Sequence, residues 1–79
     1  MTTNYEAITY RPEGCRAHTI YLAEVTTTPT LLTGFEVDDD GDVKWFDHGT
    51  TERCHVIELS LIVRRDRLSR DANGRLVVA

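Results

Sequence analysis

Three short apolar runs separated by turn-forming residues constrain the fold of this chain more than any other feature. The runs are residues 31–37, 43–46 and 55–63. Apolar and polar side chains largely alternate along them, as expected for strands whose successive side chains point to opposite faces of a sheet. Asp40-Gly41, between the first two runs, is one of the strongest short signals for a hairpin turn. We therefore predict an antiparallel β-meander over residues 31–63, with 55–63 as its core strand.

Two further strands are predicted before the meander. Residues 1–10 alternate loosely, and the first four are expected to fray. Residues 17–27 are rich in Thr, Ile, Tyr and Val, which favour strands. Apolar side chains fall on both faces of this segment, Ile20 and Leu22 on one and Tyr21, Ala23 and Val25 on the other. This pattern predicts a strand covered from both sides, or one that lies in a closed barrel with a partner outside.

The segment 66–74 has two interpretations. Asp66 could cap a single helical turn that ends at Asn73-Gly74. Alternatively, Asn73-Gly74 forms a tight hairpin turn, and residues 67–71 continue the preceding strand. In either case, residues 76–78 form a short closing strand.

Four to six short strands with little helix indicate one small all-β domain spanning residues 1–79. This layout resembles an SH3-like or similar five-stranded barrel, a resemblance carried by strand spacing and not by a motif. Gly34, inside a predicted strand, is typical of the bulge or sharp bend with which small barrels close.

The composition bears on the compartment. No apolar run approaches the length of a membrane helix, and the first residues lack the basic and apolar regions of a secretory signal. Cys15 and Cys54 are therefore interpreted as reduced thiols, with a disulfide between them as the alternative. These features predict a cytoplasmic protein that is not attached to a membrane.

The acidic turn offers a metal-site hypothesis. Counted from Glu36, the segment resembles a twelve-residue calcium loop, with oxygen donors at Asp38, Asp40 and Asp47 and glycine at the sixth place. The flanking residues, however, read as strands, whereas that loop requires helices. Clustered aspartates in such a turn are typical of a solvated hairpin tip.

A zinc site is a second metal hypothesis. Cys15, His18, Cys54 and His55 are the ligand types of a Cys₂His₂ centre, but they match no standard spacing. Adjacent strand residues such as Cys54 and His55 also point to opposite faces. No catalytic motif is present, so we predict a non-enzymatic protein without a cofactor.

The charge is uneven along the chain. The net charge of −4 combines −7 over residues 1–63 with +3 over residues 64–79. The basic end contains Arg64, Arg65, Arg67 and Arg70, which could bind nucleic-acid phosphates. The competing interpretation is a solvated face whose arginines pair with neighbouring aspartates.

We predict that the chain binds another protein through its acidic hairpin. The predicted contact residues are Asp38, Asp39, Asp40, Asp42, Lys44, Trp45 and Phe46. One ring of the adjacent Trp45-Phe46 pair should point outward, and exposed aromatics are enriched at protein interfaces. Self-association through an edge strand could add to this contact.

The acidic, arginine-rich composition is similar to that of small accessory proteins of actinobacteria or their phages. Nucleic-acid binding through the arginines and metal binding (calcium or zinc) are the alternatives.

Overall fold

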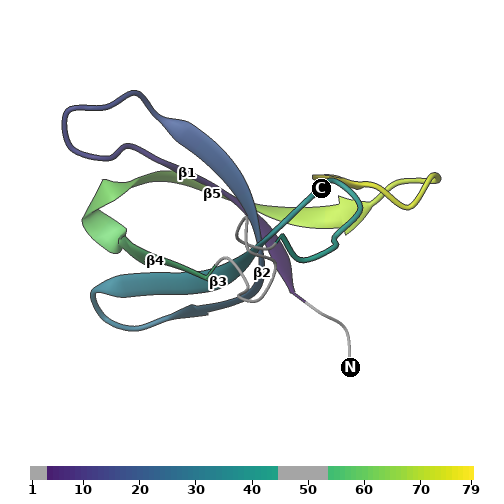
Figure 1. Ribbon diagram of the computed structural model, residues 1–79, viewed down its shortest axis with the longest axis horizontal. Helices are drawn as coiled ribbons and strands as arrows, with labels where there is room; N and C mark the ends of the chain where they lie inside the picture. Colours follow the sequence, from purple (N-terminus) through teal and green to yellow (C-terminus); the bar gives the residue numbers. More distant parts are fainter. Residues whose placement is uncertain (1–3, 45–53) are drawn as a thin grey trace.

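The part of the chain that the structure describes forms one antiparallel β-sheet of six strands. The computed structural model describes residues 4–44 and 54–79 (Figure 1). Its elements are β1 (Tyr5–Tyr10), β2 (His18–Thr27), β3 (Leu31–Val37), β4 (Cys54–Glu58), the 3₁₀ turn η1 (Leu59–Leu61), β5 (Ile62–Arg70) and β6 (Leu76–Val78). The strand order is β4-β3-β2-β1-β5-β6. The predicted all-β class is confirmed. Among the described strands the sheet is not closed, because β4 and β6 form its two edges, so the predicted closure into a barrel is not confirmed.

The predicted core strand over 55–63 is wrong as a continuous strand. The η1 turn divides it, so that its first half pairs with β3 and its second half begins β5, beside β1. The chain crosses from β3 to β1 at η1, and backbone hydrogen bonds fix both ends of this crossing. Leu59 N–H donates to the Thr30 carbonyl at 2.9 Å, and Arg11 N–H donates to the Leu61 carbonyl at 2.9 Å. Val63, expected in the core, is 65% exposed. No helix in the described part of the chain is long and apolar enough to span a membrane.

Apolar clusters cover both faces of the sheet. The first cluster contains Ala7, Ala23, Val37, Leu68 and Leu76. The second contains Ile8, Leu22, Leu32 and Ile57. The registers Glu6↔Leu22 and Ala7↔Tyr21 put these sets on opposite faces, because neighbours in a strand alternate. The prediction that residues 17–27 form a strand with apolar side chains on both faces is confirmed for β2. Val25 is a correction, because it was predicted on the face of Tyr21 and Ala23 but packs against the second cluster, beyond the irregularity at Glu24.

The irregularity predicted at Gly34 lies in the partner strand. The pairing of β2 with β3 shifts between Ala23 and Thr26, opposite Gly34, and Glu24 adopts a positive φ of 54°. Gly34 is buried and serves a different purpose, which is close packing. A Cβ at this position would lie 3.0 Å from Leu22 Cβ and 3.2 Å from the Ala23 carbonyl oxygen.

Replacing Gly34 by alanine is expected to lower the free energy of unfolding by about 1–3 kcal/mol, as overpacking in a tight core does. The added methyl group meets backbone and a fully buried side chain, neither of which can move cheaply. Urea unfolding followed by circular dichroism measures the change. Val56→Ala is the control, because Val56 is a residue of β4 that is 62% exposed. A Gly34→Ala protein as stable as the wild type would contradict this packing.

The segment 66–74 is a hairpin, so the helical-turn alternative is wrong. Strand β5 runs to Arg70 and pairs with β6 through a turn in which Asp71 Oδ1 accepts the N–H groups of Asn73 (2.8 Å) and Arg75 (3.0 Å). Gly74 supplies the required positive φ of 80°. Hydrogen bonds between residues 71 and 75 satisfy the polar groups of this short turn, so a helical turn is not required.

The acidic turn has the same construction. Asp38 Oδ1 accepts the N–H groups of Asp40 (2.9 Å) and Asp42 (3.0 Å), and Gly41 has a φ of 88°. After this turn, Val43 forms an isolated bridge with Val37. The rest of the strand predicted at 43–46 extends beyond Lys44, outside the described residues.

The two turns are joined at one end of the sheet (Figure 1). Arg70 Nη1 donates to the carbonyl oxygens of Asp40 (2.7 Å) and Gly74 (2.6 Å). Leu76 N–H donates to the Asp39 carbonyl at 2.7 Å. The Arg70 guanidinium also lies 5.4 Å from the centre of the Tyr5 ring. The acidic turn is thus fixed through its backbone, while the side chains of Asp39, Asp40 and Asp42 are exposed.

Candidate partner-binding groove

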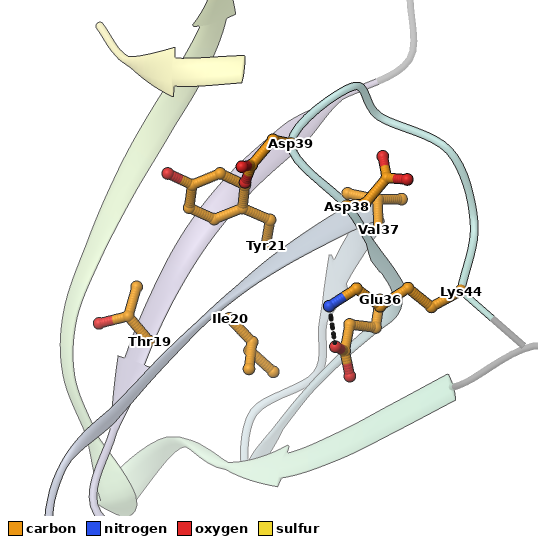
Figure 2. Close-up of a pocket in the computed structure, with 8 residues that line it drawn as sticks. All are labelled: Thr19, Ile20, Tyr21, Glu36, Val37, Asp38, Asp39 and Lys44. Carbon is orange, nitrogen blue, oxygen red and sulfur yellow. Dashed lines mark ion pairs between the residues drawn. The ribbon is translucent and has the colours of Figure 1, made fainter. Parts of the chain in front are cut away.

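A groove of about 460 Å³ lies where the chain leaves β3 and enters the acidic turn (Figure 2). Its walls come from three places: β2 contributes Thr19, Ile20 and Tyr21, β3 contributes Glu36 and Val37, and the turn contributes Asp38, Asp39 and Lys44. We call these eight residues the acidic groove. Of the predicted contact residues, Asp38, Asp39 and Lys44 line it, whereas Asp40 and Asp42 lie elsewhere on the same turn.

The acidic groove opens beside β2 at the point where β3 ends, and not on one face of the sheet. Tyr21 and Val37 pack against the first apolar cluster, whereas Ile20 packs against the second, on the opposite face. Side chains from both faces can line one groove only where two strands separate. This separation occurs after the Tyr21↔Val37 pair, because β3 ends there while β2 extends to His18.

The charge of the groove is dominated by carboxylates. Its one ammonium group, on Lys44, lies 3.0 Å from Glu36 Oε2, and His55 Nε2 lies 2.8 Å from Glu36 Oε1 (Figure 2 shows the Lys44 contact). Asp38 and Asp39 remain as an excess of negative charge. Such a site is complementary to a lysine or arginine side chain of a partner.

The environment of Glu36 shifts its pKa. Partial burial acts to raise the pKa, but the hydrogen bonds from His55 and Lys44, with their charges, outweigh burial and lower it. A carboxyl group whose pKa is lower in the folded state stabilises the fold above its unfolded pKa. That contribution is lost as the pH falls through the folded value.

Acid is therefore expected to destabilise the wild-type protein more than a Glu36→Gln variant. The difference should develop below about pH 4.3, the ordinary pKa of glutamate, because only the wild type must protonate the paired carboxylate at position 36. Urea unfolding at pH 6 and at pH 3 measures it. Glu13→Gln in the exposed β1–β2 loop changes the charge equally and should retain the wild-type response. Identical acid sensitivity of Glu36→Gln and wild type would show that the cluster contributes nothing.

The acidic turn also gathers carboxylates closely. One oxygen from each of Asp38, Asp40 and Asp42 lies within 4.8 Å of the others, the one such group among the described residues. Asp38 already accepts two backbone N–H groups, and Glu36, the first residue of the calcium-loop interpretation, is paired with Lys44 and His55. Strand β3, not a helix, precedes the turn. Asp47 lies outside the described residues.

The four residues of the zinc hypothesis are not gathered into such a group. Cys54 pairs with Phe35 and His55 with Gly34, so their side chains occupy opposite faces of the sheet. His55 contacts Glu36. Cys15 and Cys54 are exposed and are not joined by a disulfide.

The C-terminal arginines do not form one basic surface. Arg65 makes a bidentate contact with Glu6 at 2.9 and 3.0 Å, and Arg64 lies 2.7 Å from Asp66 on the other face. Arg70 joins the two turns. Arg67 is exposed. This arrangement matches the interpretation of solvated arginines paired with carboxylates, and nucleic-acid binding stays a prediction.

Two predicted contact residues, Trp45 and Phe46, lie outside the described residues. Conversely, the β2 side of the groove, Thr19 to Tyr21, was not predicted. The sequence did carry one signal for it: apolar residues on both faces of this strand. Comparisons with protein-family models, with curated proteins and with solved structures found no match.

Proposed function

We propose that this chain is a small non-enzymatic module that binds a basic segment of another protein in the acidic groove. The observation that carries the proposal is a concave site with three carboxylates, one of them neutralised by Lys44, beside the apolar surface of Ile20 and Tyr21. A long basic side chain can lay its methylene groups on such a surface while its charge meets the carboxylates.

An SH3-like arrangement of β1 to β5 is part of this proposal. The strand order β4-β3-β2-β1-β5, with one 3₁₀ turn connecting β4 to β5, supports it. Proteins with this strand arrangement often bind short segments of other proteins, but the fold alone assigns no function. The lining and charge of the acidic groove, and not the fold, therefore support binding.

A displayed library of random short peptides tests the proposal. Selected peptides should be enriched in Lys and Arg, and their binding should weaken with added salt. The double variant Asp38→Asn, Asp39→Asn should bind at least about tenfold more weakly, a loss of about 1.4 kcal/mol. Asparagine keeps the oxygen that accepts the turn hydrogen bonds, so the turn itself is preserved.

Asp71→Asn is the matched control. Asp71 makes the same two turn hydrogen bonds as Asp38 but does not line the groove. It should bind the selected peptides as the wild type does. Peptides without basic enrichment, or binding that survives in the Asp38-Asp39 variant, would contradict the proposal.

A further inference from the structure

We propose that the partner segment binds in an extended conformation and adds a strand to the exposed edge of β2 at Thr19. This inference rests on the proposed function and specifies how the acidic groove holds its ligand. Three observations carry it: the direction of the backbone groups, the space beside them and the charge around that space.

The backbone direction follows from the hydrogen bonds of β2. Glu24 N–H donates to the Asn4 carbonyl, on the β1 side, so the Ala23 carbonyl of the same peptide group points to the β3 side. Alternation gives Tyr21 and Thr19 the same direction. Tyr21 pairs with Val37, the last residue of β3. Thr19 has no partner on this side among the described residues.

The space beside Thr19 is the acidic groove itself. Beyond Val37 the chain turns away into Asp38, held by the bond from its N–H to the Asp42 carbonyl at 2.9 Å. Within residues 4–44 and 54–79, the position that a continued β3 would occupy is therefore left open, and Thr19 lines the resulting groove. Thr19 is exposed, so its N–H and carbonyl can form the two ladder bonds that an added strand needs.

The charge around the space selects the occupant. Asp38 and Asp39 border the position of the added strand, whereas Lys44 is engaged by Glu36. Strand addition supplies affinity through the main chain, and alternate side chains supply specificity. An extended segment with a lysine or arginine at alternate positions satisfies both requirements, because its backbone can pair with Thr19 while its basic side chains lie beside the groove that Asp38 and Asp39 line.

Two synthetic peptides of equal charge test the inference, Lys-Val-Lys-Val-Lys amide and Lys-Pro-Lys-Pro-Lys amide. Proline removes backbone donors and resists strand pairing. Titrations followed by protein amide chemical shifts should give at least about tenfold tighter binding of the valine peptide. The Thr19 amide should also become protected from hydrogen exchange when this peptide is bound.

The outcomes separate the two proposals. Equal binding of both peptides, or binding without protection of Thr19, would overturn strand addition while leaving the acidic groove as the site. Binding of neither peptide would overturn both. Thr19→Pro should lose the preference for valine, whereas Thr19→Ala should keep it, and both lose the 2.9 Å contact between the Thr19 and Thr9 hydroxyl groups. The wild-type exchange measurement decides the matter if Thr19→Pro does not fold.

Discussion

Replacing Leu22 by alanine is expected to bring the protein close to unfolding at 25 °C. Leu22 is fully buried, at the centre of the second apolar cluster and against Gly34 of β3. Leu-to-Ala changes in such positions cost about 2–5 kcal/mol. A typical domain has a total stability of about 5–15 kcal/mol, and small domains bury a smaller share of their surface. The loss is therefore a large part of the whole.

Chemical denaturation monitored by circular dichroism measures this loss. Val63→Ala is the control, because Val63 is also an apolar strand residue but is 65% exposed. Its stability should stay within about 0.5 kcal/mol of the wild type. Equal effects of the two substitutions would show that the second cluster does not exist as described.

Gly41→Ala is expected to cost more than Gly74→Ala, although both glycines occupy equivalent turn positions with positive φ. A Cβ at Gly74 meets nothing within 4 Å, so only the backbone conformation is penalised, by about 1–2 kcal/mol. A Cβ at Gly41 would lie 2.6 Å from Arg70 Nη2. The flexible guanidinium can move, but it then loses its hydrogen bonds to Asp40 and Gly74, worth roughly another 1–2 kcal/mol.

An Arg70→Ala background isolates this contribution. Without the guanidinium, the difference between the costs of Gly41→Ala and Gly74→Ala should shrink, as in a double-mutant cycle, to what the contact of the new Cβ with the Tyr5 hydroxyl at 3.3 Å contributes. Thermal and urea unfolding of the six proteins provide the values. A difference between the two glycines that is undiminished in the Arg70→Ala background would mean that Arg70 does not hold the acidic turn to the β5–β6 hairpin.

Local patterns in the sequence were sufficient to predict β2, β3, β6 and the two short hairpin turns. The limits of β3, predicted as 31–37, agree with the structure, and residues 76–78 form β6 as expected. Alternation of side chains along a strand and the turn preferences of Asp-Gly and Asn-Gly are local effects, so they can be read without knowing the partner strand.

The crossing at η1 could not be predicted in this way. The run Ile57 to Val63 alternates as well as any strand, and only the distant backbone partners at Thr30 and Arg11 divide it. The acidic groove was predicted only in part, because part of its lining also depends on residues that are distant in the sequence. Its acidic side is local in sequence, whereas Thr19 joins it through the pairing of β2 with β3.

The central position of β1 has a consequence for how the chain reaches its fold. One neighbour of β1 is β2, which follows closely, but the other is β5, which begins only at Ile62. During synthesis, the amide and carbonyl groups of β1 that pair with β5 in the folded protein have no partner until much of the chain has left the ribosome. Folding should therefore be slow for a domain of this size, on the order of milliseconds to seconds. In that interval, association between nascent chains would begin at the unpaired side of β1.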